Sequence, residues 1–135
     1  MRFKFLSLFF IMLLFGCAGS PIVINSMSSE ELSLQNSFSL CNAYQYKESE
    51  KVRAELERRK ILSESEWRLI DSKYLQVGMS ELSLICVKGF VIPGFGTVNE
   101  TTTSSGISKQ YVYEDAFGGR QYIYLSDGKV TSWQY

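Results

Sequence analysis

The sequence has no histidine and only two prolines and three cysteines among its 135 residues. Histidine is the commonest general base and metal ligand, so its absence removes the simplest routes to acid–base catalysis and to a metal site. Lysine and arginine number 14 and so do aspartate and glutamate, which leaves no net charge. This balance predicts no basic face for nucleic acid.

Motifs that carry chemistry are equally scarce. Gly94-Phe95-Gly96 is too short and too aromatic for a phosphate-binding loop. Glu64 and Glu66 stand at the start of a predicted helix, where capping explains them, and no Ser-x-x-Lys stands out from the many serines. Cys41 and Cys86 have no companion ligands in the sequence. We therefore predict a protein that is not an enzyme and uses no cofactor or metal.

The chain also lacks an apolar run long enough to cross a bilayer, which takes about 20 residues. Its longest run, Phe5–Phe15, follows the positive residues Arg2 and Lys4. A charged start, a short apolar stretch and a small residue at its end predict a signal peptide over residues 1–16. A signal anchor that stays uncut is the alternative.

The end of that run, Leu14-Phe15-Gly16-Cys17, resembles the lipobox of bacterial lipoproteins. Leu14 and Gly16 occupy the matching positions, whereas Phe15 is bulkier than the usual residue. The resemblance implies that Cys17 is acylated and becomes the mature N-terminus, which would attach the protein to a membrane. Ala18 follows in place of aspartate, which by the same resemblance implies the outer membrane, on its periplasmic side.

Residues 17–135 are long enough for one domain, with hydrophobic and aromatic residues at 45% and 14% of the full sequence. Without Arg2 and Lys4 the mature chain has a net charge of −2. Residues 17–27 show no sustained period, and we predict a lipidated tether there.

If Cys17 carries lipid, Cys41 and Cys86 remain, and an oxidising periplasm favours a disulfide between them. Two buried thiols are the alternative.

Residues 28–74 predict a helical extension. Ser28 or Ser29 followed by Glu30 and Glu31 is typical of a helix start. The helix is predicted to run to Tyr46, with a break near Asn36–Ser37, and to place Leu34, Phe38 and Cys41 on one face.

The rest of the extension carries the charged stretch 47–60 and then a capping box formed by Ser63 and Glu66. The charged stretch fits either an anion or partner patch or, as we favour, a solvated helix face with Val52 and Leu56 turned inward.

Beyond the extension, a further helix is predicted to begin at Ser80 and to end at Gly89.

From Thr97 the apolar period changes to two, and short turns separate strand-like segments. Asp127-Gly128 predicts a type I′ hairpin turn. The expected fold class is therefore α+β, with short N-terminal helices packed on a three-stranded or four-stranded antiparallel meander.

The strands are rich in tyrosine, and we predict that these side chains share one sheet face while Val112, Ile123 and Leu125 share the other. A row of exposed tyrosines fits a docking surface, although such rows also occur without any partner. The candidate partner surface comprises Tyr111, Tyr113, Tyr122, Tyr124 and Trp133. The loop Pro93–Gly96 is a second candidate contact.

Residues 75–135 resemble the BamE-like (SmpA/OmlA) lipoprotein domain. The resemblance rests on the order of Gly78-Met79-Ser80, a helix ending at Gly89, Tyr111-Val112-Tyr113, and a last strand entered through Gly128. One position departs from the pattern, because the proline expected two residues after Gly89 is Val91. The resemblance implies a non-catalytic accessory of outer-membrane assembly whose partner is an envelope protein. The same fold type occurs in periplasmic enzyme inhibitors, which is the alternative function.

Overall fold

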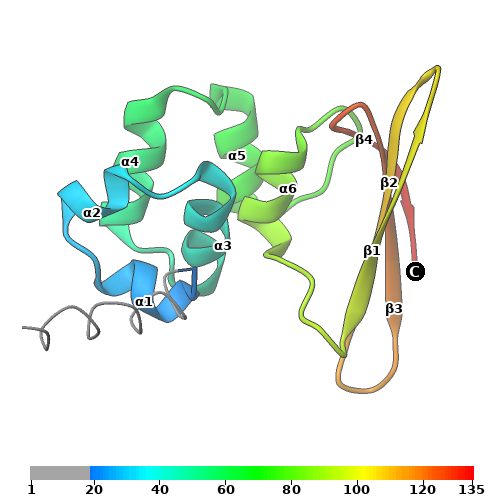
Figure 1. Cartoon of the computed structure of the whole chain (residues 1–135), viewed down its shortest axis with the longest axis horizontal. Helices are drawn as coiled ribbons and strands as arrows, with labels where there is room; N and C mark the ends of the chain where they lie inside the picture. The colour runs from blue at the N-terminus through cyan, green and yellow to red at the C-terminus, as the bar shows by residue number, and fades with distance from the viewer. Residues whose placement is uncertain (1–18) are drawn as a thin grey trace, which may run out of the picture.

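The computed structural model describes residues 19–135, so the predicted signal peptide and Cys17 lie outside the described residues. Six helices precede four strands (Figure 1). The helices are α1 (Pro21–Ser26), α2 (Ser29–Ser33), α3 (Ser37–Lys47), α4 (Glu50–Arg59), α5 (Glu64–Ser72) and α6 (Glu81–Lys88). The strands are β1 (Gly96–Thr103), β2 (Gly106–Glu114), β3 (Arg120–Ser126) and β4 (Lys129–Gln134).

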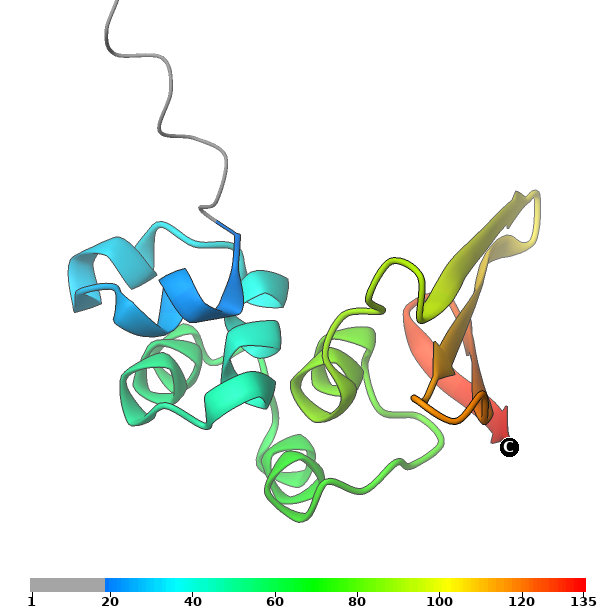
Figure 2. The same cartoon turned by 90° about the horizontal axis from the view of Figure 1, so that it is seen from below.

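The molecule has a helical layer and a sheet at opposite ends of its longest axis (Figures 1 and 2). The sheet is an antiparallel meander in the order β1-β2-β3-β4, which confirms the α+β fold and the four-stranded form of the prediction. Helix α6 lies between the other helices and the sheet, and it packs against α3 on one side and β4 on the other.

Local sequence signals account for four of the six described helix starts and for the end of α6. Ser28 with Glu31, and Ser63 with Glu66, form reciprocal capping boxes, in which each serine accepts from the glutamate's backbone N–H and each glutamate accepts from the serine's. The Ser80 side chain caps α6 as predicted, and the helix ends at Gly89, whose φ of 77° suits glycine.

The break predicted near Asn36–Ser37 is present, because the Asn36 side chain caps α3 and separates it from α2. Of the three residues predicted to share one face, Cys41 is buried, but Leu34 is 83% exposed and Phe38 is 40% exposed. Leu34 lies before the break and outside α3. Helix α3 buries Leu40, Cys41, Ala43 and Tyr44.

The predicted tether is shorter than residues 17–27. Residues 21–26 form α1, whose Ile24 is fully buried in the core. The Asn25 side-chain amide donates to the Ala43 carbonyl of α3 at 2.9 Å. One buried contact and one hydrogen bond therefore tie α1 to the helical layer.

One hydrophobic core joins the two parts of the chain that the sequence divides at residues 74 and 75. Fully buried residues come from the helical layer (Leu32, Val52, Leu56) and from α6 and the sheet (Leu84, Ile85, Ile123). The inward positions predicted for Val52 and Leu56 are confirmed. Helix α6 therefore belongs to both layers, and the sheet is positioned through it.

Candidate functional site

The candidate partner surface does not form one face, because the strand register separates its tyrosines. Tyr111 pairs with Ile123, and Val112 pairs with Tyr122, in the β2–β3 ladder. Residues directly opposite each other in a ladder point to the same side. Tyr111 and Tyr113 therefore share the inner face with Ile123, whereas Tyr122 and Tyr124 lie on the outer face. The predicted grouping of four tyrosines is wrong.

Trp133 also belongs to the inner face, since it pairs with Ile123 and packs against the core. The reason for the error is geometric. Alternation along a single strand fixes which residues share a side, but only the register between strands fixes how the sides of neighbouring strands combine. A turn over residues 115–119 sets this register, and an odd shift would have given the predicted arrangement.

On the inner face, two side chains converge on Glu81 at the first turn of α6. The Tyr111 hydroxyl donates to the Glu81 carboxylate, and the Lys109 ammonium lies 2.9 Å from the same oxygen. The hydrogen bond to Glu81 raises the pKa of Lys109. Burial, and then this carboxylate, raise the pKa of Tyr111 above its ordinary value of 10. The tyrosine therefore stays protonated and donates to Glu81 at neutral pH.

Tyr113 and Lys88 occupy the seam between the end of α6 and the sheet. The Tyr113 hydroxyl donates to the Gly89 carbonyl at 2.9 Å, and the Lys88 ammonium lies 5.1 Å from the Tyr113 ring centroid. This geometry is a cation–π contact. Burial lowers the pKa of Lys88 and raises that of Tyr113. Within residues 19–135, no carboxylate forms an ion pair with Lys88.

The outer face carries a row of hydrogen bonds that crosses all four strands. Asn99 of β1 donates to Gln110 of β2 at 3.0 Å, and Gln110 donates to the Tyr124 hydroxyl of β3 at 3.3 Å. Gln134 of β4 donates to the same hydroxyl at 3.0 Å. No helix covers this side of the sheet among the described elements (Figures 1 and 2). The row leaves a partly polar surface on which side chains are already held in place.

A shallow groove on this face includes part of the row and is also lined by Thr97, Val112 and Tyr122. Arg120 and Glu114, which line it as well, form an ion pair with their side-chain atoms 2.9 Å apart. Sequence reasoning missed Asn99, Gln110 and Gln134, although each strand contributes one amide or tyrosine to the row. Only the register between the strands would have revealed them, and the sequence of a single strand does not supply it.

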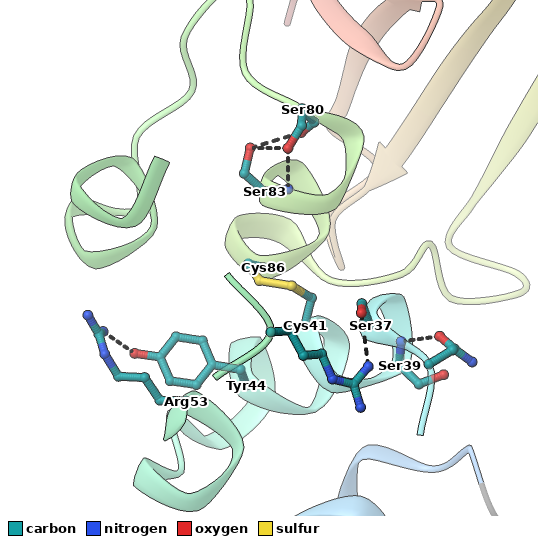
Figure 3. Close-up of a disulfide and its surroundings, with 10 residues drawn as sticks. Ser37, Ser39, Cys41, Tyr44, Arg53, Ser80, Ser83 and Cys86 are labelled. Atoms are coloured by element: carbon teal, nitrogen blue, oxygen red, sulfur yellow. Dashed lines mark hydrogen bonds between the residues drawn. A yellow bond between two sulfur atoms is a disulfide. The ribbon is translucent and has the colours of Figure 1, made fainter. Parts of the chain in front are cut away.

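The two described cysteines form a disulfide. Cys41 of α3 bonds to Cys86 of α6, and both residues are buried (Figure 3). The structure thus has the predicted pairing and not two free thiols. The bond links α3 of the helical layer to α6, which packs against β4 of the sheet.

The charged stretch 47–60 is explained by structural contacts. Arg58 and Arg59 both hold the Glu55 carboxylate, at 2.8 and 2.9 Å. Arg59 also donates to the Leu32 and Ser33 carbonyls at the end of α2. These arginines neutralise a buried carboxylate and cap a helix, so the anion-patch alternative loses two of its cations.

Arg53 is likewise held within the fold. It forms an ion pair with Asp71, its guanidinium carbon lies 4.4 Å from the Trp67 ring centroid, and it donates to the Tyr44 hydroxyl (Figure 3). The contacts connect α3, α4 and α5. Arg53 therefore acts as a structural link between three helices.

Residues 19–135 contain no group of three or more acidic, cysteine or histidine side chains placed to hold a metal ion. In the same range, no helix has both the length and the apolar character needed to cross a membrane. Comparison of the chain with protein-family models, with curated proteins and with solved structures finds no match.

Proposed function

We propose that this chain is a non-catalytic lipoprotein of the outer membrane that faces the periplasm and binds an envelope protein. The observation that carries the proposal is the division of its cysteines. Cys41 and Cys86 are paired in a buried disulfide, while Cys17 follows the lipobox-like residues 14–16. Disulfides persist in oxidising compartments such as the periplasm. The predicted export signal and the Cys41–Cys86 disulfide therefore both support a location in the periplasm.

A BamE-like domain is part of the proposal. Helix α6 begins after Gly78-Met79-Ser80 and is followed by an antiparallel meander that ends with β4. This order agrees with the pattern on which the resemblance rests. The chain adds a fourth strand, β1, and a helical layer bonded to α6.

The outer sheet face is the surface we propose for protein binding. Tyr122 and Tyr124 are half-buried there, and the amide row holds Tyr124 in one orientation. Immobilised side chains lose less conformational entropy on binding, which favours affinity. A lipid anchor would also confine the protein to a thin layer and raise the effective concentration of a membrane partner.

The test is recovery of partners from solubilised envelopes with the full-length acylated protein. The variant Tyr122→Ala/Tyr124→Ala removes two outer-face rings. The matched control, Tyr46→Ala/Tyr74→Ala, removes two exposed rings from the helical layer. Wild type and control should recover the same envelope protein, and the outer-face variant should lose it. Equal recovery by all three forms would reject the outer face as the binding surface.

A further inference from the structure

The path from Cys17 to the folded protein is short. Helix α1 begins at Pro21, four residues after Cys17. Even fully extended, four residues span at most about 14 Å. If Cys17 is acylated, as the proposed function holds, α1 must lie next to the lipid headgroups.

Helix α1 cannot swing away from the rest of the molecule, because buried Ile24 and the Asn25–Ala43 hydrogen bond fix it to α3. Its sequence, PIVINS, carries no charge. Ile22 projects from its first turn and is 64% exposed. An uncharged helix with an exposed isoleucine is compatible with the membrane interface.

Two segments with exposed apolar side chains, the loop of residues 90–95 and the β2–β3 turn, lie along the same edge of the molecule as α1. The loop of residues 90–95 starts beside α3, where the Phe90 N–H donates to the Asn42 side chain at 2.8 Å, one residue from the contact of α1 with Ala43. The loop ends at β2, where Phe95 accepts from the Glu114 N–H at 2.9 Å. Glu114 leads directly into the β2–β3 turn.

Figure 1 shows α1, this loop and the β2–β3 turn along its lower edge, and Figure 2 views that edge from below. The three segments expose five large apolar side chains, and we call the surface that they form the anchor edge. Its residues are Ile22 (64% exposed), Phe90 (42%), Ile92 (64%), Phe95 (52%) and Phe117 (99%).

One cation beside this edge, Lys88, also suits a lipid surface. Lys88 lies in the seam from which the loop departs, is half-buried, and holds its ammonium 5.1 Å from the Tyr113 ring centroid. Lysines that combine a long apolar stem with a charged head are favoured at membrane interfaces. A lipid phosphate is the counter-charge that such a group would find there.

We propose that the anchor edge rests in the phospholipid headgroup region, with Lys88 facing the lipid phosphates. The occupant of this surface is therefore the bilayer. Apolar side chains of interfacial proteins enter the boundary by about 5–10 Å. In this orientation the strands point away from the membrane, and the outer sheet face is turned sideways, open to a neighbouring protein.

The experiment uses the acylated full-length protein in vesicles of phosphatidylethanolamine and phosphatidylglycerol. Nitroxide labels are placed at Phe95→Cys and Phe117→Cys, with Ile107→Cys as the control. Ile107 is 42% exposed and belongs to the opposite end of β2 from the turn that contains Phe117. All three positions are exposed, so labelling does not disturb the core, and the bonded Cys41 and Cys86 do not react.

The measured quantity is the ratio of collisions with oxygen to collisions with a water-soluble nickel complex. This ratio should be several-fold higher for the labels at 95 and 117 than for the label at 107. Equal, aqueous collision ratios at all three positions on a protein whose mass shows the acyl group would overturn the anchor edge and leave the lipoprotein proposal standing. A mass that shows an unacylated Cys17 would overturn both.

Discussion

The Glu81 side chain joins α6 to strand β2 of the sheet. Its side chain is 13% exposed and is in contact with both Lys109 and Tyr111 of β2. Each is a hydrogen bond to a charged group, a kind that contributes about 1.5–3 kcal/mol. Removing the charge would leave the Lys109 ammonium half-buried with only the more distant Glu100 as a partner, at 3.4 Å.

We expect Glu81→Gln to lower the free energy of unfolding by about 1–3 kcal/mol, because the buried pair is broken from one side. The control is Glu64→Gln, which removes an ion pair with Arg68 whose side chains are 85% and 74% exposed. That variant should change stability by less than about 1 kcal/mol. Urea denaturation measures both, and equal effects would contradict the role assigned to Glu81.

Glu55 gives the fold a dependence on acid. Arg58 and Arg59 hold its pKa at about 2, below the ordinary value of 4.5. A carboxylate whose pKa is lower in the folded state stabilises the fold above its unfolded pKa and loses this contribution as the pH falls. The contribution should therefore be complete above pH 4.5 and disappear between there and pH 2.

The variant Glu55→Gln isolates this contribution, because every other titrating group is unchanged. At pH 7 the free energy of unfolding of wild type should exceed that of the variant by roughly 1–2 kcal/mol. This value is reduced to allow for the solvent exposure of Arg58. The difference should shrink as the pH approaches 2. If the difference in unfolding free energy stays constant from pH 7 to pH 2, the arginines do not lower the pKa of Glu55.

Among the elements, the disulfide has the largest expected effect on stability. It joins residues 45 apart in sequence, and a loop of that size corresponds to about 4 kcal/mol in the chain-entropy account. The variant Cys41→Ala/Cys86→Ala should therefore lose about 2–4 kcal/mol. Thermal unfolding of wild type with and without reductant checks this, since reduction should lower the wild-type midpoint and leave the variant unchanged.

The elements also show which features could be predicted from sequence. Caps at Ser63 and Ser80 and the turn at Asp127-Gly128 were predictable, because each signal lies within a few residues of the structure that it specifies. The faces of the sheet were not. They depend on the pairing of Tyr111 with Ile123 across a turn, and nothing within either strand encodes that pairing.

Helix α1 was missed for a related reason. A six-residue segment with one buried side chain carries too few positions to show a period. Its stability comes from packing against α3, which is a tertiary contact. The disulfide was predicted as one of two alternatives, since sequence supplies the residue types but not their separation.

For the molecule as a whole, the helical layer and the sheet have different proposed tasks. In the proposal, α1 of the helical layer and the rest of the anchor edge rest at the membrane. Helix α6, bonded to α3 and paired with β2 through Glu81, fixes the sheet relative to that edge. The outer face with Tyr122 and Tyr124 is then presented to an envelope protein. Each step of this arrangement begins with an acyl group on Cys17.

Intact-mass analysis of the protein purified from its native membrane tests this requirement most directly. We predict a chain that starts at Cys17, with a mass increased by one diacylglyceryl group and one further acyl chain. The same spectrum under non-reducing conditions should show two fewer hydrogens for the Cys41–Cys86 bond. A chain that retains residues 1–16, or one with a free thiol at Cys17, would contradict the account.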